Sequence, residues 1–217
     1  AARDRVAAGE HAVREIEAKR TRRNPSPPFT TSTLQQEASR KLSFTARQTM
    51  GVAQQLYEGV ALDGGRVGLI TYMRTDGVHI AAEALQHTRA TIDREYGARY
   101  VPDTARTYRT QAKNAQEAHE AIRPTDLSRP PQQVRDVLST DQARLYELIW
   151  KRTLASQMAS AEIDQTALVI EPGDDKHTLR ATGSVIAFDG FLRLYQEGRD
   201  DAKGDYGDRR LPQVQKD

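Results

Sequence analysis

The sequence has no cysteine and no long apolar run. Without cysteine, its 217 residues cannot form a disulfide, a zinc–thiolate site or a cysteine nucleophile. The longest apolar runs are only a few residues, whereas a membrane-spanning helix needs about 20. The first residues form a charged helical pattern instead of a secretory signal. We therefore expect a soluble, cytoplasmic protein with no membrane partner.

Several common site motifs are missing too. The five histidines are scattered, and His119 does not open a His-Glu-x-x-His zinc motif, because position 123 is Arg. The sequence contains no G-x-x-x-x-G-K-[ST] phosphate loop, no G-x-G-x-x-G loop and no Asp-x-Asp pair. We therefore expect neither a metal site nor a cofactor site within this chain.

Charge is nearly balanced overall but unevenly distributed. The net charge is +2, yet residues 1–28 hold seven Lys/Arg against four Asp/Glu, and residues 161–217 hold eight against twelve. The densest basic run is "KRTRR", residues 19–23. Such a run forms either a solvated face or a contact for a phosphate backbone, and composition leaves both readings open.

Pattern changes along the chain divide it into parts. The breaker "NPSPP", residues 24–28, separates the strand-like "AVREIEAKR" from a long helical region. After Ala161 the pattern changes to the strand-like runs "TALVI", "HTLRATGSVIAF" and "FLRLY". We predict an α+β protein in which a mainly helical domain, residues 29–160, is inserted into a small antiparallel β domain, residues 1–28 and 161–217. Neither end shows a clean element boundary, so we expect a segment of a longer protein.

Local signals set the expected elements of the helical domain. Hydroxyl residues favour helix N-caps, and glycine favours a helix end. The predicted helices begin at caps Ser32, Thr45 and Thr140 and end near Leu42, Gly59 and Met158. Further helices are predicted for residues 79–96 and 114–123, and a strand for residues 67–72. The inward stripe of the second helix is predicted to contain Met50, Ala53, Leu56 and Tyr57.

The stretch "GLITYMRTDG" places Tyr72 at the end of the predicted strand and Arg74 two residues later. In one reading Tyr72 is a half-buried strand residue and Arg74 is a surface charge, since strands are rich in tyrosine. In the other, Tyr72 is a nucleophile and Arg74 holds the group that it attacks.

The stretch "NAQEAHEAIRPTD" contains the second candidate cluster. On a helix, His119 and Arg123 are four residues apart and share a face, with Gln116 beside them. Imidazole, guanidinium and amide groups together could bind a phosphate. The alternative is a solvated surface helix.

The two clusters together suggest phosphate chemistry. A phenol with its ordinary pKa of ~10 is a poor nucleophile at neutral pH. A nearby cation stabilises the phenolate and also neutralises the charge that builds on a phosphate during in-line attack. The product would be a phosphotyrosyl ester, which conserves the energy of the broken bond.

The sequence resembles bacterial type IA DNA topoisomerases. The resemblance rests on "PFTTSTLQQEASRKLSFTARQTMGVAQQLYEGV", "GLITYMRTDG" and "NAQEAHEAIRPTD" in this order, followed by "LYELIWKRTLASQM". It implies that Tyr72 attaches to the 5′ phosphate of a cut single strand and that Arg74 positions the scissile phosphate. It also implies that His119, Arg123, Thr71 and Gln116 are DNA-binding residues.

The same resemblance implies a fold, a cofactor and partners. The family fold is a ring in which a helical, helix-turn-helix-like domain carries the tyrosine and a β-rich arch hinges it. Mg²⁺ would be held by an N-terminal domain that this sequence lacks, and a strand-gripping domain is lacking too. We therefore expect single-stranded or underwound DNA as partner, a nucleoid location and no activity of the chain alone.

One position departs from the family pattern. The family usually has serine after "MRTD", where this sequence has Gly77. The change removes a hydroxyl and an expected helix cap, which Asp76 could replace. We expect little effect on the chemistry.

Two other classes of function stay open at this stage. A non-enzymatic DNA-binding or interaction module would have Tyr72 in its core. A tyrosine recombinase would also use a phosphotyrosine, but it needs several Arg and His partners in another order.

Overall fold

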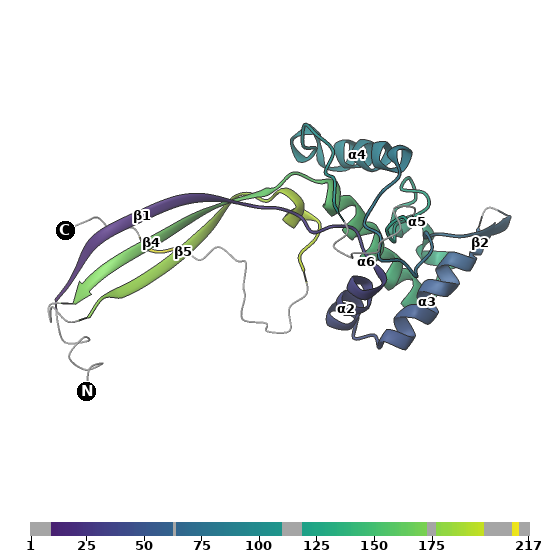
Figure 1. Ribbon diagram of the computed structural model, residues 1–217, viewed down its shortest axis with the longest axis horizontal. Coiled ribbons are helices and arrows are strands. Elements are labelled where there is room, and N and C mark those ends of the chain that lie inside the picture. The colour runs from purple at the N-terminus through teal and green to yellow at the C-terminus, as the bar shows by residue number, and fades with distance from the viewer. Residues whose placement is uncertain (1–9, 63, 110–118, 173–176, 198–209, 213–217) are drawn as a thin grey trace. The chain divides into compact units, whose positions relative to one another are not determined.

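The computed structural model arranges the chain as two compact units. Figure 1 shows long strands in one unit, here called the β unit, and helices in the other, here called the helical unit. The combination of helices with antiparallel sheet confirms the predicted α+β class. The β unit comprises residues 1–23, 161–189 and 202–217, and the helical unit residues 24–160 and 190–201. The structure describes residues 10–62, 64–109, 119–172, 177–197 and 210–212.

The unit boundaries differ from the predicted ones at two places. Residues 24–28 and 190–201 belong to the helical unit, although the sequence pattern assigned both to the β domain. The hydroxyl of Tyr108 contacts two carbonyl oxygens, that of Ser156 at 2.7 Å and that of Pro25 at 3.2 Å, so the proline-rich segment is fixed to the helical unit. The change in composition indicates a boundary near this segment, but it does not show to which of the two units the segment belongs. The identification of the units as an arch and a tyrosine domain stays a prediction.

The β unit is a three-stranded antiparallel sheet with strand order β1-β4-β5. The register of β1 and β4 places Arg23 opposite Ala161 and His11 opposite Pro172. This sheet confirms the strands predicted from "AVREIEAKR", "TALVI" and "HTLRATGSVIAF". The strands are β1 (His11–Arg23), β4 (Ala161–Pro172) and β5 (Leu179–Phe188).

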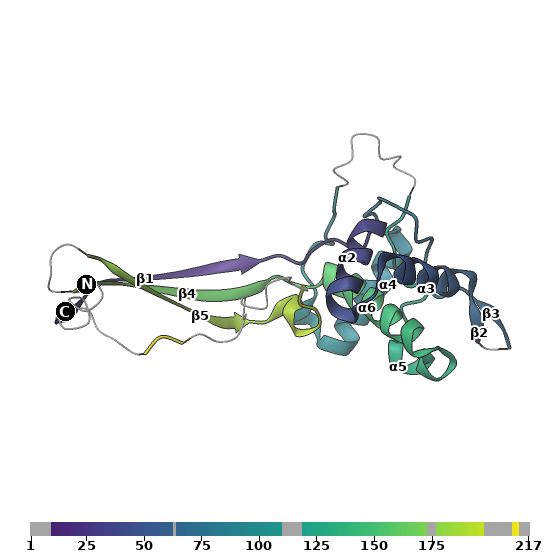
Figure 2. The same ribbon diagram turned by 90° about the horizontal axis from the view of Figure 1, so that it is seen from below.

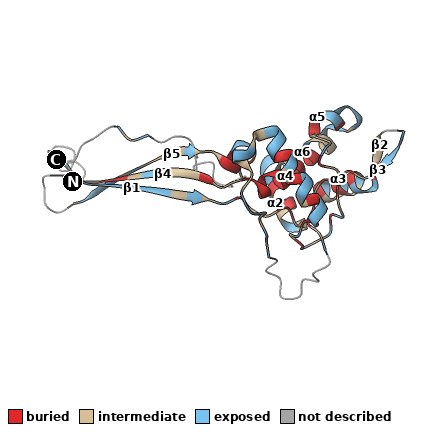
Figure 3. Cartoon of the chain, turned by 90° about the horizontal axis from the view of Figure 1, so that it is seen from above, coloured by how far each residue is buried: buried red, intermediate tan, exposed pale blue. Residues whose placement is uncertain are grey.

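Most side chains of β1 are exposed, which explains its weak alternation (Figure 3). Cross-strand ion pairs take the place of a covered apolar face. Arg20 donates to both carboxylate oxygens of Asp164, at 2.7 and 2.9 Å. Arg14 pairs with Glu171 at 2.7 Å. Exposed ion pairs of this kind contribute only about 0.2–1 kcal/mol each. Backbone hydrogen bonds between the strands therefore contribute most of the stability of the sheet.

The predicted strand "FLRLY" is wrong. Its first residues lie in a 3-10 helix, η3 (Gly190–Arg193), in which Phe191 and Leu192 are buried. The amide of Phe191 donates to the Ala159 carbonyl at 2.9 Å, just beyond the end of α6 (Thr140–Gln157). A short apolar run does not distinguish a strand from a buried helical turn, and here tertiary packing decided.

The helical unit is built around α6 (Thr140–Gln157), which contacts α2, α3, α4 and α5 (Figures 1 and 2). Eleven of its residues between Leu145 and Gln157 are buried. The helical spacing of this segment predicts an inward stripe that includes Leu145, Leu148, Ile149 and Arg152. All four are buried, and burial extends around the helix beyond them. The other elements are α2 (Thr31–Leu42), α3 (Ala46–Glu58), β2 (Val60–Leu62), β3 (Gly65–Val67), α4 (Ala82–Tyr96), η1 (Ala98–Tyr100), α5 (Pro131–Val134) and η2 (Arg135–Val137).

The observed N-cap is the predicted residue in one helix and an earlier residue in two others. Thr45 caps α3 as predicted and accepts from the Gln48 amide at 3.1 Å. The first cap is Thr30, paired with Thr33, instead of Ser32. Ser139 caps α6 instead of Thr140. Where several hydroxyl residues are adjacent, each of them could cap the helix. The residue that does so is the one whose backbone is extended just before the first helical turn.

A buried arginine ties the chain ends of the helical unit to its core. Arg152 on α6 is 4% exposed and donates to the Pro27 carbonyl at 2.6 Å. Its guanidinium also pairs with Glu197 and lies over the ring of Phe29, 4.7 Å from the centroid. A buried charge is tolerated only with such partners.

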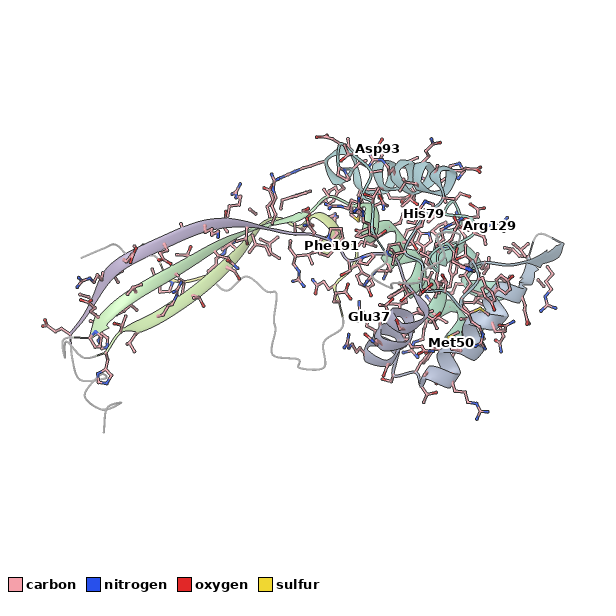
Figure 4. The ribbon with its side chains drawn as sticks, viewed as in Figure 1. Glu37, Met50, His79, Asp93, Arg129 and Phe191 are labelled. Atoms are coloured by element: carbon pink, nitrogen blue, oxygen red, sulfur yellow. The ribbon has the colours of Figure 1, made fainter. Side chains whose placement is uncertain are left out.

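Glu37 of α2, whose side chain is labelled in Figure 4, is also buried. It accepts a hydrogen bond of 2.7 Å from the hydroxyl of Tyr195. Burial raises the pKa of Tyr195, so its phenol stays protonated and remains a donor at neutral pH. The bond fixes the segment that follows η3 against α2.

Residues 119–125, here called the central segment, form an extended strip inside the helical unit. Isolated bridges pair Glu120 with His79, Ile122 with Phe29, and Pro124 with Ile70. The helix predicted for residues 114–123 is therefore wrong over its described part, and residues 110–118 lie outside the described residues. Burial of Ala121, Ile122 and Pro124 and the proline's restriction of its predecessor both favour an extended chain.

The strand predicted for residues 67–72 is shorter than expected. The Asp-Gly and Gly-Gly pairs of "LDGGRVG" predict a tight hairpin, and β2 and β3 form it, but β3 ends at Val67. The amide of Leu69 then donates to the Leu56 carbonyl at the end of α3, at 2.8 Å, and Ile70 makes only a single bridge. The segment pairs with a helix end and with the central segment instead of a neighbouring strand.

Gly77 packs directly against the central segment. A Cβ at this position would lie 2.1 Å from the carbonyl oxygen of His119. Neither Gly77 nor Asp76 caps a helix, because the cap of α4 is Ala81, without a side-chain hydrogen bond. The expected role of position 77 in capping is wrong, and close backbone approach takes its place.

We predict that Gly77→Ala lowers the stability of the helical unit by about 1–3 kcal/mol, because backbone atoms must move to admit the methyl group. Thermal unfolding followed by circular dichroism measures the change. Gly51→Ala is the matched control, since Gly51 is an exposed residue of α3 and a Cβ there meets nothing within 4 Å. This control is expected to gain up to ~1 kcal/mol. Equal melting temperatures for Gly77→Ala and the parent protein would contradict the close contact.

Candidate functional site

The loop that follows Ile70 is anchored on its first side by Thr71. The Thr71 amide donates to the Arg123 carbonyl at 2.9 Å, and its hydroxyl donates to the Ala121 carbonyl at 2.7 Å. The same hydroxyl accepts from the Arg123 amide at 3.0 Å. With these contacts Thr71 is attached to the central segment, and its hydroxyl is used within the protein.

The second side of the loop is attached to the start of α2. The Thr31 hydroxyl donates to the Met73 carbonyl at 2.7 Å and accepts from the Thr75 amide at 2.9 Å. The Thr31 amide donates to the Thr75 carbonyl, also at 2.9 Å. The side chain of Met73 is fully buried. Residue 72 therefore lies between two fixed points of the backbone.

Tyr72 points outward from this anchored loop. Its side chain is 46% exposed, and its hydroxyl makes no hydrogen bond to the described part of the chain. Its ring meets the ring of Tyr57 edge to face, with centroids 5.3 Å apart and planes at 65°. A core tyrosine would be buried with its hydroxyl satisfied, so these features contradict the core reading of Tyr72.

Arg74 and His119 are brought together at one open groove of about 470 Å³. Both side chains are exposed, and no hydrogen bond or ion pair within the described ranges engages the Arg74 guanidinium. Gly77 makes this neighbourhood possible, since it packs the Arg74 loop against the backbone of His119. The groove is lined by Thr31, Ser32, Gln35, Arg74, Thr75, Asp76 and His119.

Arg123 is placed away from that groove. Its side chain is 11% exposed, donates to Glu120 at 2.8 Å and donates to the Pro124 carbonyl at 2.9 Å. The other oxygen of Glu120 accepts from the Ala81 amide at 2.9 Å, just before α4. The predicted helical pairing of His119 and Arg123 is wrong, because residues four apart on an extended segment are separated by about 13 Å. Of the two, only His119 lines the groove. Gln116 lies outside the described residues.

Sequence reasoning missed three residues of this region. Ser32 and Gln35 line the groove. The sequence "STLQ" predicted for them only the two ends of a helix-capping box. Tyr57 was expected on the inward stripe of α3, but it is 41% exposed. The spacing of Tyr57 one residue after buried Leu56 was the available signal, since adjacent helix residues do not share a face.

Among the residues that the structure describes, no group of three or more His, Cys, Asp or Glu could hold a metal ion. No helix in the same part of the chain has the length and apolar character needed to cross a membrane.

Comparisons with known proteins identify the family. Residues 2–217 match the family model described as DNA topoisomerase. DNA topoisomerase 1 of Xylella fastidiosa strain Temecula1 is 51% identical over 210 residues, which cover 95% of this chain and 26% of the relative. The corresponding Zymomonas mobilis protein is 53% identical over 216 residues, which cover 98% of this chain and 17% of the relative.

A solved structure agrees with these relatives. Full-length topoisomerase I from Thermotoga maritima superposes with a TM-score of 0.79 at 36% identity, covering 96% of this chain and 33% of that one. The chain thus spans about a quarter of the length of its Xylella relative. The sequence and structural matches together show that this chain belongs to the bacterial DNA topoisomerase I family.

Proposed function

We propose that this chain supplies the nucleophile of a type IA topoisomerase, which cuts one DNA strand, passes another through the gap and reseals it. The observation that carries the proposal is the exposure of Tyr72 on a loop anchored at both sides. Tyr72 itself does not line the groove, but Arg74, two residues later on the same loop, lines it together with His119. Single-stranded or underwound DNA is the substrate, and relaxation of negative supercoils is the outcome.

The proposed reaction is a reversible transfer of a phosphodiester. The phenol oxygen of Tyr72 bonds to phosphorus as its proton leaves, and the bond from phosphorus to the 3′ oxygen breaks. The released oxygen takes up a proton and becomes a 3′-hydroxyl, while the 5′ phosphate stays on the tyrosine. Attack by that hydroxyl reverses the step and needs no ATP, since the ester conserves the bond energy.

Arg74 and His119 are proposed to hold the phosphate. The guanidinium of Arg74 offers paired N–H donors and a permanent charge, which suit the non-bridging oxygens as negative charge builds on them. His119 lines the same groove and adds a further hydrogen-bonding group. Ser32 and Gln35 line the groove from the start of α2, where their side chains can contact the DNA backbone on either side of that phosphate.

For Thr71 and Arg123 we propose a structural role in place of the expected DNA contact. The Thr71 hydroxyl and the Arg123 guanidinium are both bonded within the protein. Their contacts support a role in holding the Tyr72 loop and the central segment in place. A direct DNA contact by Gln116 stays a prediction.

The residues described here do not fit a Mg²⁺ site. Asp76 is the single carboxylate lining the groove, and Mg²⁺ in proteins usually needs one or two carboxylates together with substrate phosphates and waters. In the proposed enzyme the metal would belong to residues outside this chain, so no step is assigned to it here. For the same reason we propose that the chain alone is inactive.

The non-enzymatic binding module is the second candidate, but its prediction of a core Tyr72 fails. A module could still use the groove to hold a phosphate backbone without cutting it. Covalent attachment of DNA separates the two functions.

We predict that Tyr72→Phe abolishes covalent attachment of DNA, because it removes the attacking oxygen. The test uses the Xylella enzyme in which this chain replaces the matching 210 residues. With Mg²⁺ and an internally labelled single-stranded oligonucleotide, the parent chimera should give a protein–DNA adduct on a denaturing gel. Tyr195→Phe is the control, since Tyr195 is buried against Glu37. An adduct in Tyr72→Phe would contradict the assignment of the nucleophile.

We predict that the purified chain alone neither relaxes a supercoiled plasmid nor forms an adduct, with the parent chimera as positive control. Relaxation by the chain alone with Mg²⁺ would overturn this view.

We further predict that Arg74→Gln weakens binding of single-stranded DNA and lowers its salt dependence by about one unit of slope, because one phosphate contact is lost. Fluorescence anisotropy of the chimera at several salt concentrations measures both. Arg94→Gln is the matched control, because exposed Arg94 on α4 already pairs with Glu95 at 2.9 Å. Equal slopes in the Arg74 variant and the parent would exclude a phosphate contact at Arg74.

A further inference from the structure

We propose that Tyr57 is a positioning residue for Tyr72, whose ring it holds in the direction needed for attack on the phosphate. The inference rests on the proposed function of Tyr72 and adds a residue to it. It starts from the edge-to-face contact of the two rings.

The sequence brings the two tyrosines together through a close backbone contact. Tyr57 lies in the last turn of α3, and Gly68 lies directly over it. A Cβ on Gly68 would be 2.6 Å from the Tyr57 carbonyl oxygen, so only glycine allows this approach. The bond from the Leu69 amide to the Leu56 carbonyl, 2.8 Å long, continues the contact. The chain from Gly68 to Tyr72 therefore runs along the end of α3.

Tyr57 is not part of the core of α3. The buried residues of this helix are Thr49, Val52, Ala53 and Leu56. In the described part of the helical unit, Tyr57, Tyr72 and Val137 are the exposed large apolar side chains. Two of these three touch each other, so the exposed aromatic surface is concentrated at the candidate nucleophile.

The contact restrains the one part of Tyr72 that the backbone leaves free. Thr71 and Met73 are fixed on either side of it, so the rotation of its side chain remains the main freedom. An exposed tyrosine would otherwise populate several rotamers, of which only some can aim the hydroxyl at a bound phosphate. An edge-to-face neighbour favours one of them, and the strength of such pairs corresponds to a preference of roughly two- to tenfold.

A second use of an exposed aromatic ring beside a DNA site is to stack on a nucleobase. Stacking would make Tyr57 contribute to DNA affinity. Positioning makes it contribute to the rate of adduct formation at unchanged affinity. The two roles therefore differ in which measurement responds.

The experiment uses the chimera, with single-turnover adduct formation on a labelled oligonucleotide and the Kd of the same oligonucleotide measured without Mg²⁺. Tyr57→Leu should slow adduct formation roughly two- to tenfold and leave the Kd unchanged, because the rotamer preference is lost. Tyr57→Phe keeps the ring and should restore the parent rate. Tyr96→Leu is the matched control, since it breaks another tyrosine pair, with Tyr100 at 6.1 Å, away from the loop.

The outcomes separate the two proposals. If Tyr57→Leu reacts at the parent rate, or weakens DNA binding without slowing bound complexes, positioning is overturned while the assignment of Tyr72 stands. If Tyr57→Phe is as slow as Tyr57→Leu, the ring contact is not the cause and the inference fails. If the parent chimera forms no adduct, or Tyr72→Phe still forms one, the proposed function fails and the inference with it. Thermal melting of each variant confirms that the fold is intact.

Discussion

The helical unit depends on the extended pairing of the central segment. Its backbone bonds to three separate parts of the chain: the stretch before α2, the stretch after β3 and the stretch before α4. The amides of Ala121 and Ile122 each donate at 2.8 Å, to the carbonyls of His79 and Phe29. No regular sheet results, yet these bonds connect the Tyr72 loop to the helices around it. Loss of this strip would leave buried backbone groups without partners, which is costly.

Contacts with the central segment also distinguish polar side chains that bond within the protein from those that face the groove. Arg123 and Thr71 bond to the protein, whereas Arg74 and His119 face the groove. All four residue types could bind a phosphate, so chemistry alone does not assign their roles. Their contacts do, because a guanidinium that already satisfies Glu120 must break a charge-assisted bond before it can reach DNA.

The sequence was informative where local rules dominate. The Thr45 cap, the glycine-rich hairpin after α3 and the apolar stripe of α6 follow directly from neighbouring residues. The local stretch offered Tyr72 and Arg74 as candidates but left two readings open, and the family resemblance favoured the catalytic one. The structure then showed that their loop is irregular, as its fixed points, Thr31 and Arg123, are distant in sequence.

Local rules failed where long-range packing overrides them. The stretch ending at Pro124 has helical residue types, but its burial between several segments demands an extended chain. Tyr57 belongs to an amphipathic helix, and only the close approach of Gly68 reveals that it faces another tyrosine. Neither contact leaves a signal within one local window of sequence.

The close approach at Gly77 has a consequence for the width of the groove. The carbonyl of His119 sits where a side chain at position 77 would begin, so the volume at this position sets how near the two walls of the groove can come. Glycine gives the narrowest spacing. A side chain at position 77 must displace one of these walls outward, so this single residue controls the width of the space between Arg74 and His119.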